Sequence, residues 1–589
     1  MISKNRLESI IIKFLSAWLI ASMYIACMYP STFLSLSVVG EINPIVFGLI
    51  MLGAAGLLFL LEWLHKDCWI GIKFFLFLVI AYAAMIVYMN NSLYIAIGVS
   101  VLVILTFRYF INKYEEDFSK IKIGKKTAIS ILIIFIILWL VFVIGLTVLR
   151  YIVFRTPCFD FGIFSQMFYY MKEYFTPMTT CERGELLSHF KVHMSPSFYL
   201  LLPIYLIFPY QITLIVIQAV FLVSGVIPIY LLCKQKKFSI GIILAIMLVY
   251  ILFPATAGGC FYDFHENKLL LPIILWLFYF IEKKKNVGII ILTILTLLVK
   301  EDAAIYVACI GLYLILRKKE IKKGIIMFVV SVIYFFGVIY YLENFGDGAM
   351  LGRYANYMTN NGGLLDMIGT IIKNPAYLVT QVFTKEKMEF LVWMFVPIMG
   401  IIFKTKRYAD YILIIPLLVI NLMSNNPYQH SIYYQYTYGV TAILFYLVIE
   451  NVEQLIENRR NIVTTKKQLV YMCIASALLF ISALSGKLYY LDEYNANKDD
   501  FKLMREILDE IPEEASVEAS TFLVSYLSQR NVIYRMGDTE IECDYIIFDL
   551  RYKEEQEKYA EQKVSIEFLN YSEIINYDNL IAVFYKRDA

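Results

Sequence analysis

Residues 155–196 read RTPCFDFGIFSQMFYYMKEYFTPMTTCERGELLSHFKVHMSP, a polar stretch that lies between long hydrophobic segments. It concentrates acidic, basic and histidine side chains where most of the chain offers only Ile, Leu, Phe and Val. Loops held by a rigid scaffold carry a large share of binding and catalytic residues. We therefore predict that residues 155–196 belong to an active-site loop.

The composition of the whole chain indicates a membrane protein. Of its 589 residues, 60% are hydrophobic and only 17% are charged, and the mean hydropathy is +0.66. A soluble globular protein of this length does not have such a composition. The formal net charge of +3 is close to balance, so it gives no reason to expect nucleic acid as a partner. The sequence predicts an α-helical polytopic protein embedded in a lipid bilayer.

Apolar runs of roughly 17 to 25 residues predict transmembrane helices, and clusters of Lys and Arg predict which loops face the cytoplasm. Four spans between residues 9 and 110 and a fifth at 127–149 precede the polar loop. The later apolar segments, several of them short, bring the total to about fifteen. The basic clusters KQKK, EKKK, RKKEIKK and KTKR then lie inside, and the polar motifs lie on the outer face.

This topology divides the chain into three parts. Residues 1–126 hold the N-terminal transmembrane helices and a cytoplasmic linker. Residues 127–486 form the main transmembrane module, whose large outer loop covers 150–210. Residues 487–589 form a small extracytoplasmic α/β domain without a glycine-rich phosphate loop or nucleophile elbow. We expect a multi-pass protein of the cell membrane with a cytoplasmic N-terminus.

Two cysteines, Cys158 and Cys181, fall in the polar loop. In an oxidising compartment they could form a disulfide, and the alternative is two unrelated thiols. No CxxC pair occurs in the chain, which argues against a zinc ribbon or a thioredoxin-like site.

Several motifs together resemble the family known as domain of unknown function 2079 (DUF2079), over roughly residues 130 to 570. The motifs that carry this resemblance are FDFGIFSQ, YDFHENKLLLP, LLVKEDAAIYV and ASVEASTFLVSYLSQRNVIY. More remotely, the layout resembles the GT-C superfamily of membrane glycosyltransferases. That resemblance implies a GT-C-like fold, a polyprenyl-phosphate sugar donor and an acidic catalytic base or metal ligand in the first large outer loop. Asp160 matches that acidic residue by position.

Sugar transfer from a lipid phosphate needs a base for the acceptor proton and cations or donors for the departing phosphate. Asp160 follows the fifth span by about ten residues and is the candidate base; the alternative is an aspartate that caps the next helix. Asp263, His265 and Glu266 lie within four residues of one another, where they could support catalysis or bind a divalent ion. The alternative for this trio is a hydrogen-bonded loop end.

The sequence does not decide whether the protein uses a divalent metal ion as a cofactor. His189 and His193 have an i, i+4 spacing, which places them on one face of a helix and, with Asp160, would suit a metal. Ordinary histidines at the membrane interface are the alternative.

Cationic residues for a phosphate occur at two places. Lys300, Glu301 and Asp302 lie between two short apolar segments, where charges are costly. Lys300 could hold a phosphate with its acidic neighbours balancing it, and the alternative is an internal ion-pair network. Arg353 is the second candidate, and the alternative is a solvated loop arginine.

Two further residues complete the predicted substrate-binding set. His430 lies in the tyrosine-rich stretch YQHSIYYQYTY, which could line a sugar site or form the aromatic belt of a membrane interface. Gln166 lies in the polar loop itself.

The leading hypothesis is a membrane glycosyltransferase that moves a sugar from a polyprenyl-phosphate donor to an acceptor at the extracytoplasmic face. A lipid or solute transporter or flippase is the first alternative, but it would place ionisable residues near the membrane midplane and often shows internal repeats. The sequence shows no repeat, and its polar groups cluster at helix ends. A noncatalytic envelope assembly or sensor protein, acting through its outer domain, is the second alternative.

Overall fold

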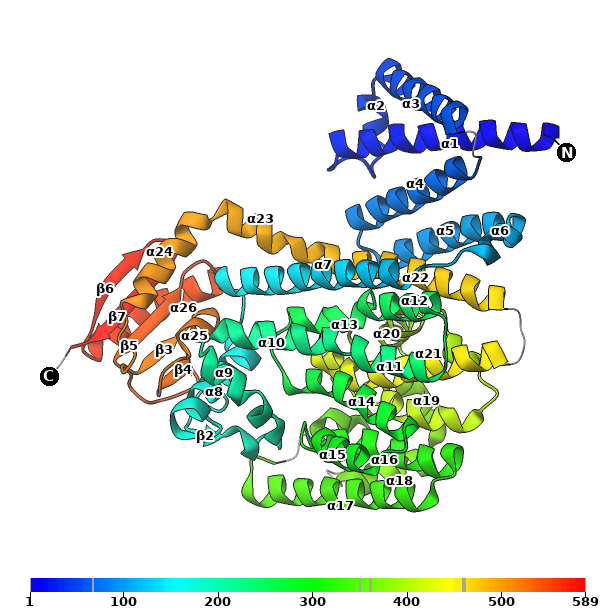
Figure 1. The fold of residues 1–589 in the computed structure, drawn as a ribbon. Coiled ribbons are helices and arrows are strands. Elements are labelled where there is room, and N and C mark those ends of the chain that lie inside the picture. Colours follow the sequence, from blue (N-terminus) through cyan, green and yellow to red (C-terminus); the bar gives the residue numbers. More distant parts are fainter. Residues whose placement is uncertain (1, 66–67, 349–350, 360–362, 458–461, 588–589) are drawn as a thin grey trace.

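The computed structural model describes residues 2–65, 68–348, 351–359, 363–457 and 462–587. Helices dominate these residues, and strands occur mainly near the C-terminus. Figure 1 shows an N-terminal group of helices that projects from a larger bundle, and a small sheet at the opposite end of the molecule.

The N-terminal group contains long apolar helices whose side chains are largely exposed, as expected for contact with lipid. Its helices are α1 (Ile2–Met28), α2 (Val38–Glu41), α3 (Pro44–His65), α4 (Cys68–Met89), α5 (Leu93–Lys113) and α6 (Glu115–Lys120). Lys13 of α1 forms an ion pair with Glu62 of α3, so the charges of these two helices are paired.

The main bundle is built around a continuous apolar core. Its helices are α7 (Lys125–Ile152), α10 (Gln211–Ser224), α11 (Val226–Gln235), α12 (Ile240–Ile251), α13 (Pro254–Gly258), α14 (Leu270–Glu282), α15 (Asn286–Leu297), α16 (Ala303–Tyr313), α17 (Ile321–Phe345), α20 (Lys385–Phe395), α21 (Tyr438–Glu457) and α22 (Ile462–Leu484). In Figure 1, α7 runs along the top of this bundle and ends beside the C-terminal strands.

Shorter elements connect these helices and cover the ends of the bundle. They are α8 (Ile163–Tyr174), α9 (Leu202–Ile207), α18 (Gly363–Lys373), α19 (Pro375–Val382) and the paired strands β1 (Met178–Thr179) and β2 (Leu187–Ser188). Single 3₁₀ or π turns are η1 (Cys158–Gly162), η2 (His189–Lys191), η3 (Pro196–Leu200), η4 (Gly259–Phe261), η5 (Glu266–Leu269), η6 (Leu314–Lys318), η7 (Leu351–Tyr357), η8 (Ile401–Lys404), η9 (Tyr408–Ile414), η10 (Leu417–Leu422), η11 (Pro427–His430), η12 (Gln435–Thr437) and η13 (Ser485–Leu488).

Nine helices in the described part of the chain are long and apolar enough to cross a membrane, or ten if the bent pair at 240–261 counts as one span. They cover Leu7–Met28, Pro44–Leu64, Gly71–Met89, Leu93–Lys113, Lys125–Ile152, Gln211–Gln235, Ile321–Phe345, Gln435–Glu457 and Ile462–Ala496. The expected total of about fifteen is therefore not confirmed. Several predicted spans form short helices, such as α14, α15 and α16, with 11 to 13 residues each. The residues of α14 and α16 are mostly buried inside the protein, whereas α15 exposes apolar side chains such as Ile290. An apolar run of this length is more often a core helix than a span.

One end of the bundle is fastened by a buried network of charges around Glu450 of α21, whose side chain is only 1% exposed. Lys236 lies 2.6 Å from its carboxylate, Arg407 3.3 Å and Lys318 3.7 Å. These cations come from different parts of the chain, so one carboxylate joins α21 to the end of α11, to η6 and to the segment before η9. A buried charge is tolerated when it is paired in this way.

The C-terminal residues form a five-stranded mixed sheet in the order β4-β3-β5-β7-β6. β3 pairs in parallel with β4 and β5, and β7 pairs antiparallel with β5 and β6. The elements are α23 (Tyr489–Ala496), α24 (Lys498–Asp509), β3 (Val517–Ala519), α25 (Thr521–Leu527), β4 (Ile533–Arg535), β5 (Tyr545–Asp549), α26 (Lys553–Phe568), β6 (Tyr571–Tyr577) and β7 (Ile581–Lys586). Arg551 donates to the backbone oxygens of Val153 and Phe154, so the sheet is tied to the end of α7.

Candidate active site

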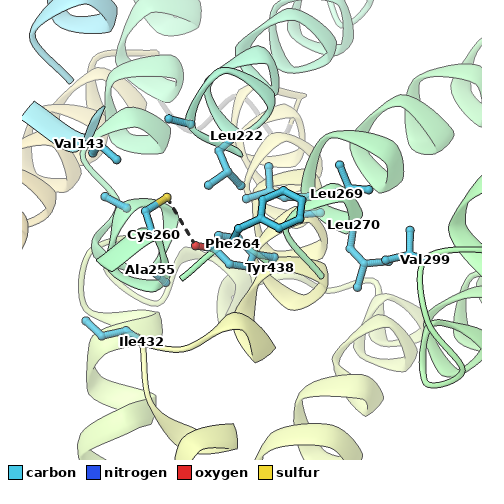
Figure 2. Packing of buried hydrophobic residues seen from close by; sticks show 14 of the residues in the cluster. Val143, Leu222, Ala255, Cys260, Phe264, Leu269, Leu270, Val299, Ile432 and Tyr438 are labelled. Atoms are coloured by element: carbon cyan, nitrogen blue, oxygen red, sulfur yellow. Dashed lines mark hydrogen bonds between the residues drawn. The ribbon is translucent and has the colours of Figure 1, made fainter. Parts of the chain in front are cut away.

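The segment YDFHENKLL, residues 262–270, is held in place by apolar side chains that enter the core on both sides of its polar ones. Phe264, Leu269 and Leu270 are each at most 4% exposed. Figure 2 shows them among Leu222, Val299 and Tyr438, with the Sγ atom of Cys260 4.0 Å from the Tyr438 hydroxyl. Because the apolar neighbours are locked by packing, Asp263, His265 and Glu266 are fixed in a buried setting.

Asp263 forms a buried ion pair with Arg150, the basic residue in the last turn of α7. The Nη1 atom of Arg150 lies 2.6 Å from Oδ1 of Asp263, and Nη2 lies 3.3 Å from Oδ2. Lys268 donates to the backbone oxygen of Asp263 and, over 2.6 Å, to Oε1 of Gln218. Sequence reasoning missed Arg150, Lys268 and Gln218. A basic residue at the end of a long apolar run, such as Arg150, usually marks only the membrane interface.

Glu266 is fully buried and lies between two nitrogen atoms. The Nδ1 atom of His265 is 3.0 Å from one carboxylate oxygen, and the Nζ atom of Lys300 is 3.0 Å from the other. Burial opposes ionisation of Glu266, but His265 and Lys300 together hold its pKa well below the usual range. Lys300 precedes α16, so this ion pair joins the 262–270 segment to the turn between α15 and α16.

Asp160 lies in η1, directly before α8, and its charge is not neutralised by a direct partner. Its Oδ2 atom is buried and accepts no hydrogen bond. Burial raises the pKa of Asp160 to about 7, and the nearby carboxylates of Asp263 and Glu266 contribute to this rise. No side chain caps α8, which begins after Gly162, so the capping alternative finds no support in this described segment. The two aspartates therefore lie within electrostatic reach of each other, although 103 residues separate them in the sequence.

The turn Lys300–Asp302 and Arg353 of η7 approach one another at the same place. Burial raises the pKa of Asp302 to about 6, with Lys300 and Arg353 among the charges that act on it. The guanidinium of Arg353 lies over the ring of Tyr436, 5.1 Å from its centre. Arg353, Lys300 and Asp160 are all within electrostatic reach of the Tyr436 hydroxyl. Tyr436 belongs to the tyrosine-rich stretch, and nothing in that stretch distinguishes it from the neighbouring tyrosines.

The two loop histidines are each paired with a glutamate through their Nδ1 atoms. His189 lies 2.9 Å from Oε2 of Glu182, and His193 lies 2.8 Å from Oε1 of Glu301. The ring centres are 5.9 Å apart. Within the described ranges, no group of three His, Cys, Asp or Glu side chains is arranged to hold a metal ion. Glu182 is a further residue of the site that the predictions did not include.

We call these side chains the polar cluster, which comprises Arg150, Asp160, Glu182, His189, His193, Asp263, His265, Glu266, Lys268, Lys300, Glu301, Asp302, Arg353 and Tyr436. Its members come from the polar loop, from the ends of α7 and α15, and from η5, η7 and η12. The cluster combines an unpaired carboxylate oxygen with several cations, which is the set of groups that acid–base and phosphate chemistry requires.

Two predicted site residues lie elsewhere. The imidazole of His430 is near Lys387 and Glu386, at the start of α20. Gln166 is fully buried, and its Nε2 atom donates to the hydroxyl of Thr180 and to the backbone oxygens of Arg530 and Asn531. These bonds fasten the polar loop to the C-terminal sheet.

The two loop cysteines are neighbours, yet both are free thiols. The Sγ atom of Cys158 lies 3.6 Å from the backbone oxygen of Cys181, and both side chains are buried.

The fold and the polar cluster define a helical, multi-pass membrane protein with buried charges gathered beside its C-terminal sheet. The chain belongs to the family described as "Predicted membrane protein (DUF2079)", whose model matches residues 150–581. The comparison with curated proteins gave no match. Among solved structures, the chain is similar to ArnT from Cupriavidus metallidurans bound to undecaprenyl phosphate, with a TM-score of 0.46 and 11% identity over 77% of this chain and 98% of ArnT. The apo state of the same ArnT gives a TM-score of 0.39 and 10% identity, over 76% and 97% of the two chains.

Proposed function

We propose that this protein is a glycosyltransferase of the cell membrane, which transfers a sugar from a polyprenyl-phosphate donor to an acceptor hydroxyl. The observation that carries the proposal is the state of Asp160. It is a carboxylate with a buried, unpartnered Oδ2 atom and a pKa of about 7, and it lies beyond the end of a membrane-spanning helix, within electrostatic reach of Lys300.

Asp160 is the proposed general base. A base works best when its pKa lies near the working pH, because it is then both available and strong enough to take a proton. The acceptor oxygen attacks the anomeric carbon of the sugar, the bond from that carbon to the phosphate oxygen breaks, and the acceptor proton passes to Asp160. The polyprenyl phosphate leaves with the electron pair of the broken bond.

Lys300 and Arg353 are the proposed phosphate-binding residues. As the sugar leaves, negative charge grows on the phosphate, and cations fixed beforehand in a buried site stabilise that charge strongly. Lys300 is held by Glu266 at 3.0 Å, and Arg353 is stacked on Tyr436, so neither cation has to reorganise during the reaction. Asp263 and Glu266 are positioning residues in this scheme, because they orient Arg150, His265 and Lys300.

We further propose that the polar cluster and residues 487–589, as an α/β domain, face the extracytoplasmic side. The support is the distribution of charge, since the basic clusters of the loops then lie on the cytoplasmic side. Residues 1–126 and 127–486 are the two transmembrane parts in this arrangement.

The test is sugar transfer by the purified full-length protein in nanodiscs, with a panel of radiolabelled polyprenyl-phosphate hexoses and pentoses as donors. Asp160→Asn should lower the transfer rate by a factor on the order of 10² to 10⁴, the usual contribution of a general base. Glu185→Gln is the matched control, because Glu185 is an exposed acid in the same loop. Unchanged transfer by Asp160→Asn would remove Asp160 from the reaction.

A further inference from the structure

Two cavities outside the polar cluster meet at Tyr210, which lines both of them. The first, here called the polar cavity, has a volume of about 510 Å³ and lies between the ends of α7, α8, α24 and α25. The second, here called the apolar groove, has a similar volume of about 510 Å³ and is formed by α9 and the first turns of α10. Apart from Tyr210 and Thr213, the residues that line the groove are Ile, Val and Phe. The two cavities therefore adjoin at Tyr210, with polar lining on one side of this residue and apolar lining on the other.

The position of these cavities along the spans places their junction at a membrane surface. The candidate span Lys125–Ile152 ends beside the polar cavity, which Tyr151 lines, and the span Gln211–Gln235 begins there with Gln211. The groove follows that second span from Ile212 to Phe221. Nine helical steps of about 1.5 Å cover about 14 Å, close to half of the hydrocarbon core of about 30 Å. The groove therefore has the depth of one leaflet.

The polar cavity is lined by equal numbers of basic and acidic side chains. Lys172 and Arg530 are opposed by Asp509 and Glu513. The guanidinium of Arg530 already donates from Nε and Nη1 to the backbone oxygens of Leu527, Pro512 and Ala515, over 2.8 to 3.1 Å, so three of its five N–H donors are used within the protein. This lining favours a neutral head group over an anionic one.

The remaining wall of the polar cavity suits hydroxyl groups. Four tyrosines line it together with carboxylates and side-chain amides, namely Tyr151, Tyr169, Tyr210 and Tyr526. Tyr526 donates to Asp509 over 2.8 Å, and Gln211 donates to the backbone oxygen of Tyr526 over 2.9 Å. These hydrogen bonds hold the lining side chains in position without a ligand. Aromatic faces combined with a few fixed polar groups are the usual lining of a small-molecule site.

The polar cavity lies next to the polar cluster, because residues close together in the sequence contact the cluster and line the cavity. Arg150 binds Asp263 in the cluster, while the next residue, Tyr151, lines the cavity. On α8, the ring of Phe164 contacts His189 and His265 in the cluster, while Tyr169 lines the cavity. A ligand in the cavity would therefore lie next to the proposed reaction site.

We propose that the polar cavity and the apolar groove bind one lipid with a neutral, hydroxyl-rich head group, such as a glycosylated diacylglycerol. One chain lies in the groove within a single leaflet, and the head group fills the cavity. The assignment of this lipid as the acceptor of the sugar rests on the proposed function, whereas its binding does not.

Binding is tested with full-length protein in phosphatidylcholine nanodiscs, using monoglucosyl diacylglycerol with a photoreactive diazirine in one acyl chain. Adducts mapped by mass spectrometry should concentrate on residues 204–221. Val216→Trp, which fills the groove, should lower this labelling by about tenfold, as expected when about two CH₂ groups of the bound chain lose their apolar contacts. Val329→Trp is the matched control, because Val329 is a lipid-exposed valine on the separate span α17.

Competition then identifies the head group. Unlabelled monoglucosyl diacylglycerol should abolish the labelling, whereas diacylglycerol and phosphatidylglycerol should not. Even labelling of all spans, equal loss in both tryptophan variants, or equal displacement by the other two lipids would mean ordinary surrounding lipid and would overturn the proposal. Asp160→Asn should keep full labelling, so a failure of sugar transfer and a failure of lipid binding give different results.

Discussion

Arg150 and Asp263 form a two-point ion pair that joins the end of α7 to the 262–270 segment, with both side chains less than 10% exposed. The two residues are 113 positions apart in the sequence. The pair therefore fixes the distance between the end of a membrane-spanning helix and the segment that carries His265 and Glu266.

Replacing Arg150 with Met should strongly destabilise the protein, because it leaves the carboxylate of Asp263 buried without its partner. Loss of one member of a buried pair typically costs about 3–5 kcal/mol. The measurement is thermal unfolding of the purified protein in detergent, and the double variant Arg150→Met/Asp263→Asn should recover part of the loss. Arg183→Met is the control, because the Arg183–Asp347 pair is exposed and should contribute less than about 1 kcal/mol. Equal shifts for the two single variants would contradict this account.

The pH dependence of transfer should report the state of Asp160. A base acts in its deprotonated form, and burial with nearby carboxylates raises the pKa of Asp160 to about 7. Activity should therefore rise as the pH increases through about 7, and it should be lost as the pH falls below that value. In Asp302→Asn, whose replaced carboxyl has a pKa of about 6, the step near pH 7 should remain. A rate that does not change between pH 6 and pH 8 would argue against Asp160 as the base.

Lys300 should affect the use of the donor and also, as a member of a buried ion pair, the stability of the fold. Lys300→Met removes the cation beside Glu266 and should lower transfer by a factor of about 10² to 10³, the cost of losing one group that stabilises developing charge. Lys300→Arg keeps the charge and should recover much of the rate. The measurement compares kcat and KM for the polyprenyl-phosphate donor, together with thermal unfolding. If both variants lose activity only in proportion to unfolding, Lys300 is structural.

The membrane class of the protein was predictable, whereas the number of spans was not. Composition alone excludes a soluble protein, and the structure confirms a helical chain with many apolar helices. The predicted number of spans includes segments such as α14 and α16, which are short and mostly buried. They were included because hydropathy measures whether a side chain avoids water and not whether it faces lipid or protein. Both environments select the same Leu, Ile and Phe residues.

Several residues of the candidate site could be predicted from the sequence, but their arrangement in space could not. The motifs singled out Asp160, Asp263, Glu266 and Lys300 because charges are rare in this chain, and the structure places them within electrostatic reach of one another. The partner of Asp263 could not be found by the same reasoning, since Arg150 looks like an ordinary basic residue at the end of a span. Gln166 is the opposite kind of error, a residue predicted for the site that lies outside it. Its side chain instead binds the backbone next to the C-terminal sheet.

Glu450 gives a separate test of how buried charges hold the bundle, in a network that shares no residue with the polar cluster. Lys236, Lys318 and Arg407 all lie within 3.7 Å of its carboxylate, and Arg317 lies 3.9 Å away. Glu450→Gln therefore leaves four cations with one fewer counter-charge. We expect a loss of stability of about 3–5 kcal/mol, as for other buried pairs that lose one partner. Glu457→Gln is the matched control, because Glu457 is 58% exposed and contacts Arg407 alone among the described ion pairs. Thermal unfolding should show a clearly lower midpoint for Glu450→Gln than for Glu457→Gln. Because Glu282 and Glu453 also contact Lys236, a small effect at Glu450 would mean that these two carboxylates compensate and that the network does not depend on its most buried member.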